Sequence, residues 1–257
     1  MSWQPTKRQF LRRSLAGAGA LVLAGCDRLG QTTWFPKLLA TGETLSNTAH
    51  RALLSRKAMA QEFSEADLSP DFRSNGTANP NSAQYQAMVK NGFADWTLKV
   101  DGLVEKPVQL TMAQLQAMPQ RTQITRHDCV EGWSAIGKWS GVPLHEILKM
   151  VQPKPSAKFV VFHCADPMEA DGTVPYYESI DLDDAYHPQT ILAHALNGNT
   201  LPVANGAPLR LRVERQLGYK QAKYLMRIEL VERYDQIAGG KGGYWEDVAG
   251  YQWYAGI

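Results

Sequence analysis

The sequence predicts an α+β fold whose sheets are mixed or mostly antiparallel. Residues 96–104 and 207–215 alternate apolar and polar side chains, which is typical of strands that bury one face. Strand-like segments of this kind outnumber the helical ones along the chain. The two types do not follow the regular βαβ order of a parallel sheet, so an α/β fold is disfavoured.

The first elements are an arm, a loop and a strand. Residues 27–64 are expected to form an arm, in which 49–63 could be helical. Residues 69–82 are rich in Ser, Asn, Gly and Pro and predict a loop. The strand at 96–104 runs into an Asp-Gly turn. Its two faces are predicted to carry Trp96, Leu98 and Val100 on one side and Thr97, Lys99 and Asp101 on the other.

Later elements follow the same reasoning. Residues 111–119 predict a short helix that begins at a threonine cap and stops at Pro119. Residues 143–151 predict a second helix, with one apolar stripe formed by Leu144, Ile147, Leu148 and Val151. Further strand-like segments are 158–165, 190–202 with an Asn-Gly turn, and 222–232. The tail, 239–257, is rich in glycine and aromatic residues.

The N-terminus predicts export. Arg12 and Arg13 precede a short apolar run of small residues, the pattern of a twin-arginine signal, so a periplasmic location is expected. The run is too short for a comfortable membrane span, although an uncleaved anchor helix is the alternative. It ends in LAGC, which resembles a lipobox and makes Cys26 a candidate lipid anchor. Asp27 resembles the signal for retention at the inner membrane.

Domain organisation and composition narrow the function classes. We expect a signal at 1–26, the arm at 27–64 and one domain at 65–257. The hydrophobic content of 44% supports a substantial core, and the net charge of +2 argues against a nucleic-acid partner. If Cys26 carries lipid, Cys129 and Cys164 remain. Disulfides persist outside the cytoplasm, so composition alone favours a Cys129–Cys164 bridge and a ligand role equally.

Cys129 lies in an unusually polar and aromatic segment, TRHDCVEGWSAIGKW. In an extended chain His127 and Cys129 face the same side, whereas His163 and Cys164 face opposite sides, which argues against a four-ligand zinc site. A cysteine nucleophile would need His127 as a base and a third orienting group. A thiolate ligand to a soft or redox metal remains. His127 could equally be a histidine that hydrogen-bonds the backbone.

Two further segments suggest an anionic ligand. Residues 205–227 hold six basic residues and one acidic one, with Gly206 and Gly218 permitting close approach of a ligand. Arginine suits phosphate, but a solvated strand face explains the charges equally well. Residues 71–77, DFRSNGT, could contact a heterocycle and a phosphate, although a turn is the simpler interpretation.

These three segments, in this order, resemble the sulfite oxidase family of molybdenum–molybdopterin enzymes over about residues 65–235. The resemblance implies that family's fold, a molybdopterin cofactor and Cys129 as the thiolate ligand of molybdenum. It also implies roles in binding the cofactor for Arg73, Asn75, Cys164, Asn205, Arg210, Gln221, Ala222 and Lys223. Cys164 stands where the related branch has a threonine, which puts that contact in doubt.

Residues 130–134 distinguish between branches of the family. They lack the arginines that help the sulfite-oxidising branch to bind its anion, and CVEGW instead resembles the periplasmic methionine sulfoxide reductase catalytic subunit. Glu131 would repel sulfite, and it could hold a proton if burial raises its pKa. His127 and Glu131 are therefore candidate supporting or proton-transfer groups. No segment resembles a cytochrome b5 domain, so a separate electron partner is expected, for which a membrane haem protein is a candidate.

Two hypotheses follow. The first is a periplasmic, membrane-tethered molybdopterin oxidoreductase that transfers an oxygen atom and reduces sulfoxides or N-oxides rather than oxidising sulfite. The second is a non-catalytic lipoprotein with a Cys129–Cys164 bridge, whose basic strand binds an anionic partner.

Overall fold

The computed structural model describes residues 58–168 and 174–257, together with 31–35, 38, 41–42, 45 and 48–49. The chain divides into two compact units, Met1–Ser55 and Arg56–Ile257. The predicted signal, the lipobox with Cys26 and part of the predicted arm lie outside the described residues. Across the described part of the chain, no helix is both long enough and apolar enough to cross a bilayer.

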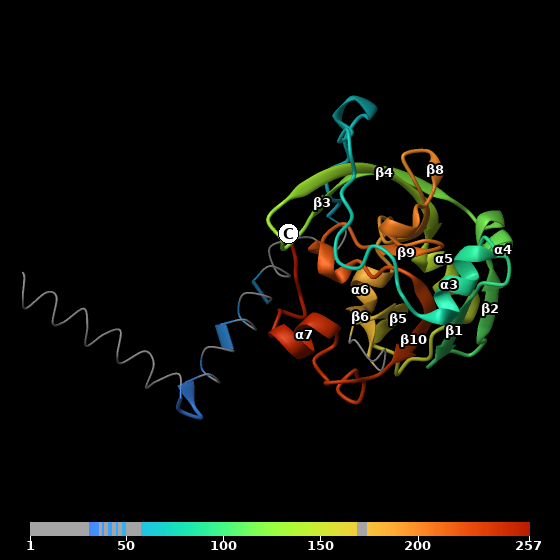
Figure 1. Ribbon diagram of the computed structural model, residues 1–257. Coiled ribbons are helices and arrows are strands. Elements are labelled where there is room, and N and C mark those ends of the chain that lie inside the picture. The colour runs from blue at the N-terminus through green and yellow to red at the C-terminus, as the bar shows by residue number, and fades with distance from the viewer. Residues whose placement is uncertain are drawn as a thin grey trace, which may run out of the picture. The chain divides into compact units, whose positions relative to one another are not determined.

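Within Arg56–Ile257, the first sheet is mixed. Its strand order is β2-β1-β10-β5-β6 (Figure 1). The strands are β1 Thr97–Gly102, β2 Val108–Thr111, β5 Phe159–Pro167, β6 Pro175–Asp181 and β10 Leu225–Val231. β1 and β10 are parallel, and the other neighbours are antiparallel. Gly102 ends β1 with φ +85°, and a Cβ there would lie 2.3 Å from the Leu230 carbonyl oxygen, so glycine is required.

The second sheet is antiparallel, with the order β3-β4-β7-β8, and β9 pairs with β7. Its strands are β3 Arg121–Asp128, β4 Ser134–Pro143, β7 Ile191–Leu196, β8 Asn199–Thr200 and β9 Arg210–Arg212. Within Arg56–Ile257 the helices are α3 Ala83–Lys90, α4 Met112–Ala117, α5 Leu144–Val151, α6 Leu182–Ala185 and α7 Tyr244–Ala249, and the 3-10 turns are η1 Glu65–Asp67, η2 Val203–Asn205 and η3 Gly218–Lys220. This arrangement confirms the predicted α+β class.

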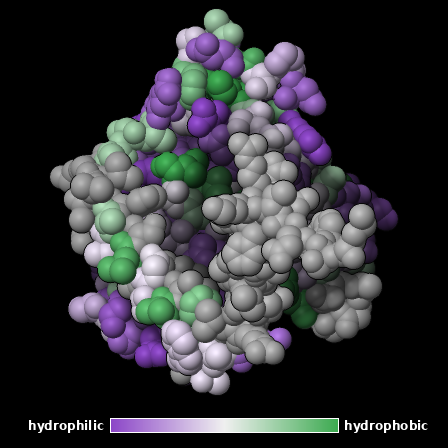
Figure 2. Space-filling model, turned by 90° about the vertical axis from the view of Figure 1, so that its left-hand side faces the viewer, coloured by the Kyte–Doolittle hydropathy of each residue, from purple (hydrophilic) through white to green (hydrophobic). Residues whose placement is uncertain are grey.

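The main hydrophobic core joins the first sheet to α5. The predicted stripe of α5 is fully buried in it, and so are Leu98 and Val100 of β1. A smaller core surrounds Trp139 of β4. On the face that Figure 2 shows, coloured hydrophobic residues occur in small groups among hydrophilic ones. The apolar residues of the sequence pattern are therefore used mainly inside, where their burial stabilises the fold.

Most of the local predictions are confirmed. Thr111 caps α4, where its hydroxyl accepts from the Gln114 N–H at 3.2 Å, and the Asn197-Gly198 turn joins β7 to β8. The predicted helix at 49–63 is wrong at its C-terminal end, because residues 58–63 are not helical. There the chain follows β3, and the Phe63 N–H donates to the Ile124 carbonyl at 2.8 Å. Helices α3 and α7 were not predicted.

Candidate active site

Cys129 lies immediately after β3, in a tight turn that leads to β4. Its N–H donates to the Trp133 carbonyl at 2.9 Å, and its carbonyl accepts from the Gly132 N–H at 3.0 Å. Gly132 has φ +84°, which side-chain-bearing residues rarely adopt. Burial is the main cause that raises the pKa of the Cys129 thiol, and the Glu131 carboxylate raises it further. A hydrogen bond from the Glu131 N–H and the charge of Arg73 lower the pKa and so oppose this rise. Without a metal the thiol is therefore protonated at neutral pH, and coordination would release that proton.

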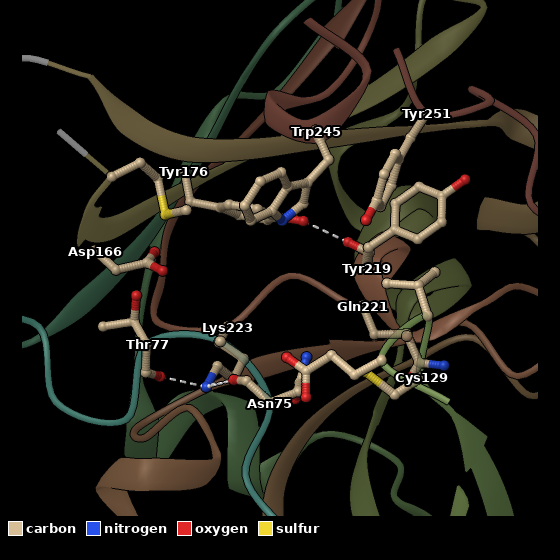
Figure 3. Close-up of a pocket in the computed structure, with 15 residues that line it drawn as sticks. Asn75, Thr77, Cys129, Asp166, Tyr176, Tyr219, Gln221, Lys223, Trp245 and Tyr251 are labelled. Carbon is tan, nitrogen blue, oxygen red and sulfur yellow. Dashed lines mark hydrogen bonds between the residues drawn. The ribbon is translucent and has the colours of Figure 1, made fainter. Parts of the chain in front are cut away.

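A cavity of about 250 Å³ opens beside this turn (Figure 3). Its walls combine the turn between β3 and β4, the end of β5 and the start of β6 with η3, α7 and the loop at 75–77. Five residues predicted from the sequence line it: Asn75, Cys129, Glu131, Gln221 and Lys223. The fold thus brings together three segments that carry candidate functional side chains and are far apart in the sequence.

Lys223 holds the loop at 75–77 in place. Its ammonium group donates to the carbonyls of Asn75 at 2.6 Å and Ala204 at 3.1 Å, and also to that of Thr77 (Figure 3). Burial and then Arg210 lower the pKa of Lys223 to about 7. An anion in this cavity would favour the charged amine, so the site is suited to a phosphate group.

Arg210 and Arg212 do not form the solvated strand face that was one interpretation of the basic segment; both are 0% exposed. Their guanidinium groups lie 5.0 and 4.4 Å from the centroid of the Trp139 ring. Arg212 pairs with Glu214 through both carboxylate oxygens, at 2.9 and 2.6 Å. Arg210 donates to the Asn205 and Gln221 carbonyls at 2.9 and 3.3 Å. Arg210 therefore shapes the backbone behind Lys223 rather than lining the cavity.

His127 is fully buried and does not line the cavity. Its Nδ1 lies 3.0 Å from Arg212 Nη1 and 3.4 Å from Gln221 Oε1, so it contacts side chains, not the backbone as one interpretation held. Burial and the charges of Arg212 and Arg210 hold its pKa well below the ordinary value. A neutral His127 that accepts from Arg212 is best suited to positioning, and a direct proton-transfer role is disfavoured by this placement.

Glu131 does not meet the condition on which its proton-holding role was predicted, because it is exposed rather than buried. Its carboxylate accepts from Trp133 Nε1 at 2.8 Å, which orients it beside Cys129. It retains its other predicted property, a negative charge at the cavity wall next to the thiol.

The remaining predicted residues do not line the cavity. The guanidinium carbon of Arg73 lies 5.4 Å from the centroid of the Trp133 ring. Asn205 Nδ2 donates to the Phe72 carbonyl at 3.4 Å. Ala222 is buried, and its carbonyl accepts from the Leu211 N–H at 2.8 Å. Cys164 is buried on β5 and does not line the cavity. Their proposed contacts with a cofactor stay predictions.

Neither disulfide nor zinc chemistry is supported. Cys129 and Cys164 are both free thiols. His163 faces away from Cys164 and binds Glu229, with 2.9 Å between Nε2 and Oε2. Within the described ranges, no three His, Cys, Asp or Glu residues form a group that could hold a metal ion. A metal here would depend on Cys129 and on ligands that the cofactor brings.

Four of the lining residues that sequence reasoning missed bear on the chemistry of the cavity. Asp166, at the end of β5, is buried, and its Oδ1 has no hydrogen-bond partner. Tyr219, Trp245 and Tyr251 form an aromatic wall. Asp166 gives no sequence signal beyond an acid at the end of a strand. The tail's aromatic content was a signal, but its packing against residues far away in sequence could not be read from composition.

Comparison with known proteins identifies the chain. The family described as the oxidoreductase molybdopterin binding domain matches residues 85–237, more than half of the sequence. The chain belongs to this family. It is therefore a molybdopterin-dependent oxidoreductase that transfers an oxygen atom, and the non-catalytic hypothesis is wrong.

Two curated relatives and one structure show how far the likeness extends. A protein of Azospira oryzae named as protein-methionine-sulfoxide reductase subunit YedZ1 is 37% identical over 98% of this chain and 88% of its own length. The protein-methionine-sulfoxide reductase catalytic subunit MsrP of Xanthomonas axonopodis is 42% identical over 57% of this chain. The matched region covers 48% of the length of MsrP, so this chain spans about half of that relative. The sulfane dehydrogenase SoxCD of Paracoccus pantotrophus is 24% identical, with a TM-score of 0.49 over 54% of this chain and 39% of that one.

The cavity of this molybdopterin-binding chain fits its cofactor chemically. Asn75 Oδ1 and Asp166 Oδ1 are buried, have no hydrogen-bond partner and belong to residues that line the cavity, so both can accept from a bound group. A pterin carries N–H donors that such acceptors suit. Lys223 supplies a cation for the phosphate, and the Cys129 thiol supplies a soft metal ligand. Hydrogen-bond acceptors for the pterin, a cation for the phosphate and a thiol for the metal thus line one cavity.

Asp166→Asn should stabilise the cofactor-free enzyme at neutral pH. Burial raises the pKa of Asp166 from 3.8 to about 6; a backbone hydrogen bond, Lys223 and Thr77 oppose that rise. The folded state therefore binds more protons than the unfolded state, and wild-type stability falls as pH rises from about 4 through about 6. Asparagine does not ionise, so the variant should gain up to about 3 kcal/mol near pH 7.5 and nothing from this source near pH 4.

Denaturant unfolding of both cofactor-free proteins across this pH range measures the effect. Asp71→Asn, at an exposed position, is the matched control and should show no such gain. A stability difference between wild type and Asp166→Asn that does not change with pH would contradict the assigned burial of a charged Asp166.

Proposed function

We propose that this enzyme reduces sulfoxides, with methionine sulfoxide in proteins as the substrate class. The reaction converts a sulfoxide, two protons and two electrons into a sulfide and water. The observation that carries the proposal is the wall next to Cys129, where an exposed carboxylate, Glu131, occurs and residues 130–134 contain no arginine. Such a wall accepts a neutral sulfoxide and disfavours an anion such as sulfite. The names of the two relatives support the same substrate class.

Each lining residue has a separate task. When bound, the molybdenum cofactor supplies the two-electron redox chemistry and the site of oxygen transfer. Cys129 Sγ would hold the metal, Asn75 Oδ1 and Asp166 Oδ1 would accept from the pterin, and Lys223 would neutralise the phosphate. His127 keeps Arg212 in place, and Arg212 in turn packs against the Trp139 ring.

Removal of oxygen as water requires protons at the cavity. Asp166, whose pKa is about 6, can hold a proton close to neutral pH. The chain thus offers one buried group at the cavity wall that can hold a proton.

We further propose that the protein acts in the periplasm. The paired arginines Arg12 and Arg13 support export by the twin-arginine route, and the LAGC motif supports a lipid tether at Cys26 and retention at the inner membrane. We propose that the electrons come from a separate protein, for which a membrane haem protein is a candidate.

Turnover of purified holoenzyme tests the substrate class. With a reduced dye as donor, methionine sulfoxide should be reduced, and with an electron acceptor sulfite should be oxidised at least about tenfold less efficiently in kcat/KM. A trimethylamine N-oxide arm tests the other neutral oxo substrate. Efficient sulfite oxidation without any sulfoxide reduction would overturn the proposal.

A further inference from the structure

The aromatic wall of the cavity comes largely from beyond the family match. The match ends at residue 237, whereas Trp245 and Tyr251 lie on and just after α7. The Trp245 and Tyr251 rings stack with centroids 5.9 Å apart, and Tyr251 meets Tyr219 edge-on at 5.0 Å. In Figure 3 Trp245 and Tyr251 lie across the cavity from Lys223 and Asn75. The polar and aromatic groups thus occupy opposite walls.

A buried ion cluster fixes this segment beside the cavity. Lys220 of η3 donates to the carboxylates of Glu178 at 2.5 Å and Glu246 at 2.7 Å, and the three side chains are at most 1% exposed. Glu246 directly follows Trp245, so the cluster holds the backbone that carries the indole. A buried pair of this kind is sensitive to the loss of one partner, which makes the position of α7 well determined.

Additional contacts hold the segment before and after α7. The Asp247 carboxylate accepts from the N–H groups of Gly239 at 2.9 Å and Lys241 at 2.8 Å. After α7, the Leu217 N–H donates to the Ala255 carbonyl at 2.9 Å. The rings of Trp245 and Tyr251 are therefore held in position before any substrate arrives, which lowers the entropy lost on binding.

We propose that Trp245 and Tyr251 form the subsite that holds the alkyl arm next to the sulfoxide sulfur and so select sulfoxides with an extended apolar arm. This assignment rests on the proposed sulfoxide reductase function. Aromatic faces attract methylene groups and polarisable sulfur, and they offer no cation to an anionic substrate. A methionine sulfoxide side chain has such an arm, whereas dimethyl sulfoxide has only methyl groups and gains little from the wall.

Substrate selectivity of the holoenzyme provides the first test. Trp245→Ala and Tyr251→Ala should each raise KM for N-acetylmethionine sulfoxide about tenfold and leave kcat/KM for dimethyl sulfoxide within about twofold. Tyr251→Phe keeps the ring and should behave as wild type. Val248→Ala, on the same helix but 56% exposed and outside the cavity lining, is the matched control.

Binding provides a second test that does not need turnover. N-acetylmethionine sulfone cannot be reduced in the same way and can be titrated calorimetrically into resting holoenzyme. Its dissociation constant should rise about tenfold in Trp245→Ala and stay unchanged in Val248→Ala. An unchanged constant together with an unchanged selectivity ratio overturns the subsite. A lower molybdenum content in Trp245→Ala also overturns it, because the wall would then hold the cofactor.

The two proposals can fail separately. If wild-type enzyme reduces neither sulfoxide, the proposed function fails. The sulfone titration then still decides whether Trp245 helps to hold the alkyl arm of such a ligand. If wild-type enzyme is active and its selectivity does not depend on either ring, the function stands and the subsite is wrong.

Discussion

Cys129→Ser is expected to lower sulfoxide turnover by at least about a thousandfold. A hydroxyl is a harder and poorer ligand for molybdenum than a thiolate, so the electronic state of the metal would change. The fold should remain, because Cys129 lies in a turn held by backbone hydrogen bonds of residues 129–133 that serine can also make. The variant should also retain most of its cofactor through Lys223 and the other cavity contacts. Steady-state turnover per bound molybdenum measures the effect.

Cys164→Ala is the matched control for this result. Cys164 is also a free thiol, but it is buried on β5 and does not line the cavity. Turnover is counted per bound molybdenum, so loss of the predicted cofactor contact at Cys164 would lower occupancy and not this ratio, which should stay within about twofold of wild type. Wild-type turnover in Cys129→Ser would show that Cys129 is not the ligand.

Lys223→Met is expected to lower the affinity for the cofactor about ten- to a hundredfold, with less effect on turnover per bound molybdenum. The change keeps a similar side-chain volume but removes the buried cation that would face the phosphate, a charged contact of about 1.5–3 kcal/mol. It also removes the hydrogen bonds by which Lys223 holds the Asn75 and Thr77 carbonyls, which loosens the loop at 75–77. Lys158→Met is the matched control, because Lys158 is an exposed lysine paired with Glu232 far from the cavity lining. Molybdenum per chain after dialysis measures the difference, and full occupancy in Lys223→Met would place the phosphate elsewhere.

The same lysine predicts how cofactor binding depends on pH. In the cofactor-free protein burial lowers the pKa of Lys223 from 10.5 to about 7, so the amine is largely neutral at higher pH. A phosphate favours the protonated form, so binding above about pH 7 takes up a proton and weakens as pH rises. Molybdenum retention in wild type should therefore fall between about pH 7 and pH 9, and this dependence should be reduced in Lys223→Met.

Local patterns were sufficient for much of the fold. The alternation at 96–104 matches β1, and the apolar stripe of 143–151 matches the buried face of α5, because each pattern reflects burial of one side of one element. Helix α7 was missed because its stability comes from the Lys220 cluster, whose members are separated by tens of residues in sequence. Residues 58–63 follow β3 instead of forming a helix, since pairing with a strand outweighs a weak helical preference.

The sequence predicted those residues of the candidate site that lie in recognisable motifs. Cys129, Asn75 and Lys223 were chosen from separate segments, and the structure places all three at one cavity. Alternation correctly put Arg210 and Arg212 on one face of a strand, but it could not show that Trp139 covers that face. Asp166 was missed, because its raised pKa arises from burial, a property of the assembled fold.

The most direct test of the central claim is X-ray absorption at the molybdenum edge of wild-type holoenzyme and Cys129→Ser. If Cys129 is the protein ligand, the wild-type spectrum contains one more sulfur neighbour than the spectrum of the variant, and Cys164→Ala matches wild type. Identical sulfur shells in wild type and Cys129→Ser would contradict the account, because the thiolate in this turn would then not hold the metal.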